Sequence, residues 1–251
     1  PEYERLYDGI EFPLPEQYMP IDPYTPTFSP PSPQPFEKCP DFRRYGNNIQ
    51  MYLKLYYAMV TQIDANVGKI MTELERLGIE ENTAVIFSSD HGDIHGMKNK
   101  CLPYERSCGI PLIIKIPGMK QPPVVDIPVS AVDYYPTCMA LAGADSCKKL
   151  PGQSLLPVLQ GMSFEHEAVF AEHLAYTSPR YMLRDERYKL VIDAKSHEVR
   201  MLFDMWNDPQ ESRNLAEDLA HAEVRKDLYY KLLDRGFHWK KSLIRFHIPR
   251  S

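Results

Sequence analysis

The sequence has 251 residues, which suits one large domain or two small ones and allows a substantial buried core. Hydrophobic residues make up 43%, charged residues 25%, and the net charge is −5, so a disordered tail, a coiled coil and a collagen-like rod are excluded. This charge predicts no nucleic-acid partner, and the absence of any apolar run of ~20 residues predicts no membrane span.

Proline dominates residues 1–40, which hold 11 of the 23 prolines. Prolines at this density prevent helices and central strands, so the stretch is expected to be an extended arm. The chain does not begin with Met and shows no signal peptide, which is expected of a processed or truncated piece. Five cysteines form no zinc-binding pattern and leave disulfides and localisation open.

Residues 41–150 are predicted to form the C-terminal part of a large α/β domain. Apolar residues recur at alternating steps of three and four between positions 47 and 77, which predicts one long helix that Gly78 ends. Apolar runs at 83–89 and 110–116 predict buried strands. Helix and strands in this order indicate a mostly parallel sheet flanked by helices.

Residues 151–251 are predicted to form a small α+β subdomain. A loop and short helix over 128–142 precede it, and four short β-rich pieces separated by polar turns predict an antiparallel sheet. An amphipathic helix over 215–235 is expected to close this subdomain. The four pieces are 168–172, 181–184, 189–192 and 200–203.

The most informative string is Asp90-His91-Gly92, which directly follows the apolar run 83–89. In open α/β sheets, ligands bind beyond the carboxyl ends of the strands. A carboxylate beside an imidazole can bind a divalent metal, and glycine allows a sharp turn or a close backbone approach. The alternative is a structural loop in which Asp90 caps the next turn.

Further motifs follow in a fixed order and favour a functional site over a structural loop. Together they resemble the C-terminal half of a sulfatase, in the alkaline-phosphatase superfamily, from about residue 45 to 216. Any one motif is weak, but the ordered set is specific. The set comprises residues 57–68, Asp90-His91-Gly92, Lys100, Tyr104-Glu105, Ile110-Pro111-Leu112, Val132–Thr137, Gly152–Pro157, Leu202-Phe203-Asp204 and Asn207–Ala216.

The resemblance implies roles for three of these residues. Asp90 and His91 correspond to the strand-end pair that completes a site for one calcium ion. Because calcium prefers oxygen, His91 has the alternative of contacting the metal edge-on or a sulfate oxygen. Lys100 corresponds to the lysine before Tyr-Glu that contacts the sulfate group, where an ammonium neutralises oxyanion charge. Glu105 is expected to be structural.

The sequence also departs from the family pattern. It contains no Cys/Ser-x-Pro-Ser/Thr-Arg string, the site of the formylglycine nucleophile, and lacks the first two acidic calcium ligands. We therefore expect this chain to be inactive alone, with formylglycine in a missing N-terminal segment; a second copy of the chain is the other candidate partner. His95 is a candidate loop ligand, and His173 and Arg180 are candidates for shaping the substrate pocket.

The predicted parent activity is hydrolysis of a sulfate ester on a small molecule or carbohydrate. A secreted, periplasmic or lysosomal-type compartment would suit such an enzyme. One alternative is a phosphomonoester, phosphonate or phosphodiester hydrolase of the same superfamily, which would use different metals. The other is a non-catalytic module that binds a glycan or a partner.

Overall fold

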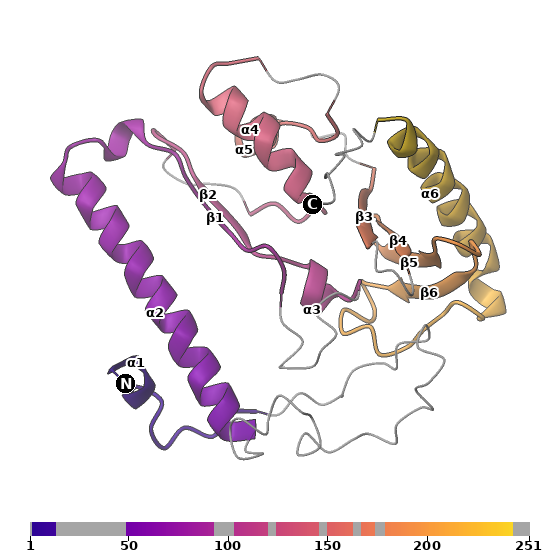
Figure 1. Ribbon diagram of the computed structural model, residues 1–251, viewed down its shortest axis with the longest axis horizontal. Helices are drawn as coiled ribbons and strands as arrows, with labels where there is room; N and C mark the ends of the chain where they lie inside the picture. The colour runs from indigo at the N-terminus through magenta and orange to yellow at the C-terminus, as the bar shows by residue number, and fades with distance from the viewer. Residues whose placement is uncertain are drawn as a thin grey trace, which may run out of the picture. The chain divides into compact units, whose positions relative to one another are not determined.

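The computed structural model describes residues 2–13, 49–92, 103–119, 124–145, 150–162, 167–173 and 179–242. They belong to two compact units, Pro1–Gln121 and Pro122–Ser251, and Figure 1 shows their helices and strands. The boundary expected at residues 150–151 stays a prediction. Across it, Asp133 and Thr137 accept hydrogen bonds from the backbone amides of Gln153 and Leu155.

The first unit begins with α1 (Glu2–Arg5) and the long helix α2 (Ile49–Arg76), followed by the 3-10 turn η3 (Glu80–Asn82). The predicted helix over 47–77 is confirmed, and Gly78 follows it with a φ of +66°. The turn of helix in α1 shows that residues 2–5 of the expected arm are not extended, since no proline separates them. Residues 14–48, with most of the prolines, lie outside the described residues.

Two strands complete the first unit, β1 (Val85–Ser88) and β2 (Leu112–Lys115), with the short helix α3 (Glu105–Cys108) between them. They pair antiparallel and are half-buried or exposed, so the expected buried, mostly parallel sheet is not confirmed by the described strands. The connection leaves β1 and returns to β2 at the same end. A hydrogen bond of 2.7 Å from the Gly92 amide to the Ser107 carbonyl joins its two arms there.

The second unit begins with η4 (Ala131–Asp133), α4 (Tyr134–Leu141) and α5 (Leu156–Leu159). Asp133 is fully buried and its two carboxylate oxygens accept the amides of Ser130 and Gln153, each at 2.8 Å. Asp133 is thus the third residue of a capping box that Ser130 begins at η4, whereas its side chain makes no capping hydrogen bond to α4. This carboxylate fastens the start of α4 to the segment that leads into α5.

A four-stranded antiparallel sheet forms the rest of the second unit, in the order β3-β4-β5-β6, as predicted. Helix α6 (Ala222–Ser242), entered through η5 (Leu219–His221), packs on it. α6 begins later than the helix predicted over 215–235, because the Leu215 amide bonds to the Leu202 carbonyl of β6 and the Asp218 side chain caps the turn η5. The strands are β3 (Val169–His173), β4 (Arg180–Arg184), β5 (Tyr188–Asp193) and β6 (Val199–Asp204).

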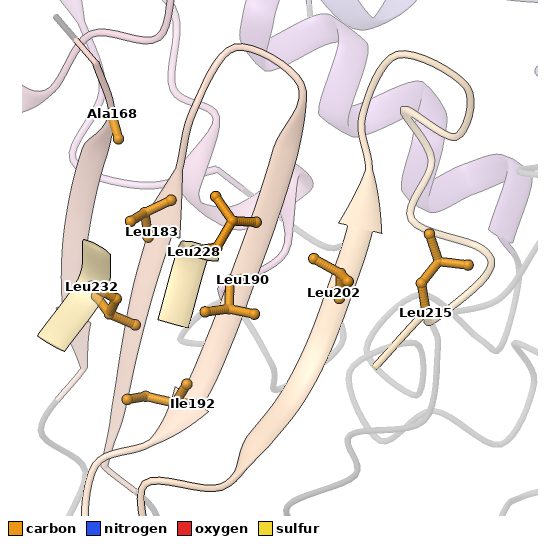
Figure 2. Packing of buried hydrophobic residues seen from close by; sticks show 8 residues of the cluster. All are labelled: Ala168, Leu183, Leu190, Ile192, Leu202, Leu215, Leu228 and Leu232. Carbon is orange, nitrogen blue, oxygen red and sulfur yellow. The ribbon is translucent and has the colours of Figure 1, made fainter. Parts of the chain in front are cut away.

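Leucine side chains hold α6 to the sheet. Figure 2 shows Leu228 and Leu232 of the helix beside the inward-facing residues of the strands. Burial of such side chains is the main favourable term in the folding of this unit. The strand residues of this core include Leu183, Leu190, Ile192 and Leu202. No helix in the described part of the chain is long and apolar enough to cross a membrane.

The motif at the end of β6 is a structural turn. Asp204 accepts hydrogen bonds from the Arg187 guanidinium, the Asn207 side chain and the Trp206 amide. The hydrogen bond from Arg187 is the largest of the causes that lower the pKa of Asp204 to about 2, and burial acts in the opposite direction. Nearby, Lys189 and Glu211 form a buried ion pair at 2.6 Å. These residues stabilise the turn and the sheet edge.

Candidate functional site

The candidate site lies at the carboxyl end of β1. Ser88, the last residue of this strand, donates a hydrogen bond of 2.9 Å to the carbonyl of Pro111, next to β2. This bond joins the two strands at this end, and β1 ends before Ser89. Asp90 and His91 follow immediately, on the loop that the sequence predicted to carry a ligand.

Asp90 presents an open carboxylate. Its side chain is 84% exposed, and its Oδ1 accepts the backbone amide of His91 at 2.9 Å. That hydrogen bond is the first reason that the pKa of Asp90 lies below its ordinary value; burial opposes it and the nearby His91 charge adds to it. The carboxylate is consequently ionised at neutral pH, while Oδ2 faces the imidazole of His91.

The imidazole of His91 is held by a neighbouring carbonyl. Its Nδ1 lies 2.8 Å from the Gly92 oxygen, and because a carbonyl can only accept, Nδ1 carries the proton. Its Nε2 lies 3.5 Å from Asp90 Oδ2. Both ring nitrogens therefore face acceptor oxygens, and a metal cation placed between Nε2 and Oδ2 would be contacted by both atoms.

Gly92 sets the position of this pair. A Cβ atom built on Gly92 would lie 2.0 Å from the Arg106 carbonyl oxygen in α3, so only glycine permits this approach. The Ser89 hydroxyl donates to the His91 carbonyl at 2.8 Å and restrains the turn from the other side. Sequence reasoning missed Ser89 as a positioning residue; a hydroxyl beside a strand-end aspartate was the available signal.

The donor atoms fit part of a cation site. Two atoms 3.5 Å apart can both lie within the about 2.3–2.6 Å that calcium requires of its ligands. Calcium takes about six to eight ligands, so the pair covers one side of such an ion. Among the residues that the structure describes, no group of three or more His, Cys, Asp or Glu side chains is placed to hold a metal.

The other predicted site residues are placed differently. Lys100 and His95 lie outside the described residues, so their roles stay predictions. His173 and Arg180 belong to the second unit, where they are directly paired between β3 and β4. Their side chains share the sheet face opposite to the α6 core, and Arg180 is 3% exposed. Their substrate-binding role also stays a prediction.

Two family models match the sequence. The sulfatase model covers residues 18–144, and the model of the C-terminal part of N-sulphoglucosamine sulphohydrolase covers residues 93–236. The two matches overlap over residues 93–144, and Asp90, His91 and Gly92 lie within the sulfatase match directly before this overlap. Together they extend over most of the chain, in agreement with the resemblance that the ordered motifs indicated.

Individual proteins agree with the family models. Arylsulfatase K of Danio rerio is 38% identical over 215 residues, which are 75% of this chain and 41% of the relative. BT4656 in complex with its substrate D-glucosamine-2-N,6-O-disulfate matches with a TM-score of 0.66 and 27% identity, over 77% of this chain and 42% of its own.

A further solved structure widens the range of chemistry among the neighbours. The phosphonate monoester hydrolase from Silicibacter pomeroyi matches with a TM-score of 0.68 and 27% identity, over 79% of this chain and 43% of its own. The chain thus spans less than half of the length of each of these three proteins. With both family models matched over half of its residues or more, the chain belongs to the sulfatase family.

Proposed function

We propose that this chain supplies the strand-end metal ligands and a sulfate contact of a sulfate ester hydrolase. The observation that carries the proposal is the facing pair of Asp90 Oδ2 and His91 Nε2, 3.5 Å apart at the end of β1 in a chain of the sulfatase family. The open carboxylate and the oriented imidazole are suited to one side of a calcium site.

Each residue has a defined chemical task in this proposal. Asp90 contributes an anionic oxygen ligand, and His91 contributes Nε2 either to the metal or to a sulfate oxygen. Lys100 neutralises a sulfate oxygen as charge builds on it in the transition state. Bound calcium would polarise the sulfate oxygens. The nucleophile must come from outside these 251 residues, because the formylglycine motif is absent from the sequence.

The proposed substrate class is a sulfated small molecule or carbohydrate. Support comes from BT4656, whose substrate is a disulfated glucosamine, and from the arylsulfatase name of the Danio rerio relative. The second candidate is phosphonate monoester hydrolysis, which the structural match to the Silicibacter pomeroyi enzyme favours. A sulfate ester and a phosphonate monoester both carry anionic oxygens on a tetrahedral centre, so the proposed ligands would suit either.

The test uses a joined protein, in which residues 1–251 replace the matched segment of Danio rerio Arylsulfatase K. Hydrolysis of an aryl sulfate and of an aryl phosphonate monoester is measured in parallel, with the 251-residue chain as the inactive reference. We expect turnover of the sulfate ester by the joined protein. Faster turnover of the phosphonate would select the second candidate, and no turnover of either would contradict the enzymatic proposal.

Lys100 is tested against a matched lysine two positions earlier. Removing one charge-stabilising donor typically slows turnover about 100-fold or more, and we expect this for Lys100→Ala in the joined protein. Lys98→Ala, which removes the same charge two positions earlier in the sequence, should stay within about twofold. Equal losses in the two variants would remove Lys100 from the proposed site.

A further inference from the structure

Helix α2 is covered on one side by the N-terminal segment. The Gln50 side chain exchanges two hydrogen bonds with the Phe12 backbone, Lys54 binds Asp8 at 2.6 Å, and Tyr57 stacks on Phe12 at 4.8 Å. The residues that α2 uses for these contacts recur every three or four positions and define one face of the helix. This face is mostly polar.

The apolar stripe of α2 lies on a different face. At about 100° per residue, the stripe is centred more than a quarter turn from the face that holds the N-terminal segment. Leu53, near the start of the stripe, is 3% exposed, whereas further along the helix Val60 is 50% exposed, Ile63 49% and Ile70 57%. An amphipathic helix normally buries such a stripe, whereas in the described part of the chain Val60, Ile63 and Ile70 stay about half exposed.

The β1–β2 sheet shows the same incomplete burial. In the described part of the chain it has two strands, so each strand keeps one outer edge without a strand beside it. The residues of both strands are mostly apolar, and Ile113 of β2 is 63% exposed. Two-stranded sheets are marginally stable in water and normally gain strands or a packed helix.

We propose that the α2 stripe and the β1–β2 sheet form the docking surface for the part of a sulfatase domain that this chain does not match. The length of the relatives supports this occupant. BT4656 and the Silicibacter pomeroyi enzyme match 77% and 79% of this chain, yet the matched part is only 42% and 43% of their own chains. More than half of each neighbour is therefore available to cover an apolar surface of this size.

Cysteine labelling tests the surface directly, and peptide mass spectrometry separates the new site from the five native cysteines. Ile63→Cys should react quickly with a maleimide in the 251-residue chain. In the joined protein the reaction should slow at least about tenfold, because docking buries the side chain. Gln62→Cys, one position away on an exposed polar part of α2, should react equally in both proteins.

Three results would overturn the proposal. Slow labelling of Ile63→Cys in the dilute 251-residue chain would show that the chain covers its own stripe. Labelling that slows as that chain is concentrated would identify a second copy as the occupant. Fast labelling in the joined protein would show that the surface stays open.

A charge variant gives an independent measurement. Ile63→Glu should raise the aggregation or lower the folded yield of the joined protein, since it buries a charge in the interface, whereas Gln62→Glu should leave both unchanged. The inference rests on family membership and not on the proposed catalytic activity. Labelling needs no metal and no turnover, so an inactive joined protein with a protected Ile63→Cys would uphold the docking surface and contradict only the enzymatic proposal.

Discussion

Asp90 and Asp204 both lie where a β-strand ends, but they differ in exposure and in the number of hydrogen-bond donors around them. The Asp204 side chain is 7% exposed and is surrounded by donors from Arg187, Trp206 and Asn207. The Asp90 side chain is 84% exposed, and its Oδ2 faces an imidazole nitrogen. A carboxylate with its acceptors filled stabilises a turn, whereas one with an open oxygen retains the capacity to bind a ligand.

The largest expected effect comes from removing the filled carboxylate. Asp204→Ala leaves Arg187 and the amides of the turn without their acceptor, so we expect a loss of about 2–4 kcal/mol in the free energy of unfolding. Urea denaturation followed by circular dichroism measures this difference. A loss below about 1 kcal/mol would show that Asp204 does not hold the turn.

Gly92→Ala tests the backbone approach that positions the open carboxylate. The added Cβ would meet the Arg106 carbonyl at 2.0 Å, so we expect a loss of about 1–3 kcal/mol and faster hydrogen exchange of the amide at position 92. Gly68→Ala is the matched control within α2. It has nothing within 4 Å of the added Cβ and should stabilise the helix by about 0.5–1 kcal/mol. Equal effects of the two variants would contradict the contact.

The stabilising effect of Asp204 should also depend on pH. The folded-state pKa of Asp204 is about 2, below its ordinary value of 3.8, so its stabilising effect is complete above the ordinary value. That effect disappears as the pH falls toward about 2. The difference in unfolding free energy between the wild type and Asp204→Ala should therefore shrink on acidification. A difference that does not change with pH would contradict the ionised state of Asp204.

The smallest expected effect on stability is that of Asp90→Ala. An exposed carboxylate with one backbone hydrogen bond contributes little to the fold, so the midpoint of thermal unfolding should stay close to that of the wild type. Thermal unfolding of the 251-residue chain measures it. A loss as large as that of Asp204→Ala would mean that Asp90 is a structural cap, the alternative that the sequence left open.

Much of the fold follows from local patterns. The apolar stripe of α2 and the turn-separated strands β3 to β6 were predictable because each pattern reflects its own backbone geometry. The antiparallel pairing of β1 with β2 was not, since an apolar run indicates a strand but not the direction of its neighbour. The exposure of the α2 stripe was also hidden, because periodicity locates an apolar face without identifying what covers it.

The candidate site was predictable only in part. The position of Asp90 and His91 at a strand end follows from the apolar run before them. The orientation of His91 depends on a carbonyl contact, and the fit of Gly92 depends on α3, which lies further along the chain. Such contacts arise from tertiary packing and leave no spacing signal. Lys100 and His95 keep the status of predictions.

Calcium titration of the joined protein tests the central claim most directly. With Asp90→Asn, which keeps the size of the side chain and removes its charge, we expect calcium affinity to fall at least about tenfold. Asp126→Asn, the same change at another exposed aspartate, should leave the affinity unchanged. Calcium affinity that is equal in the wild type and in Asp90→Asn would contradict the assignment of Asp90 as a metal ligand.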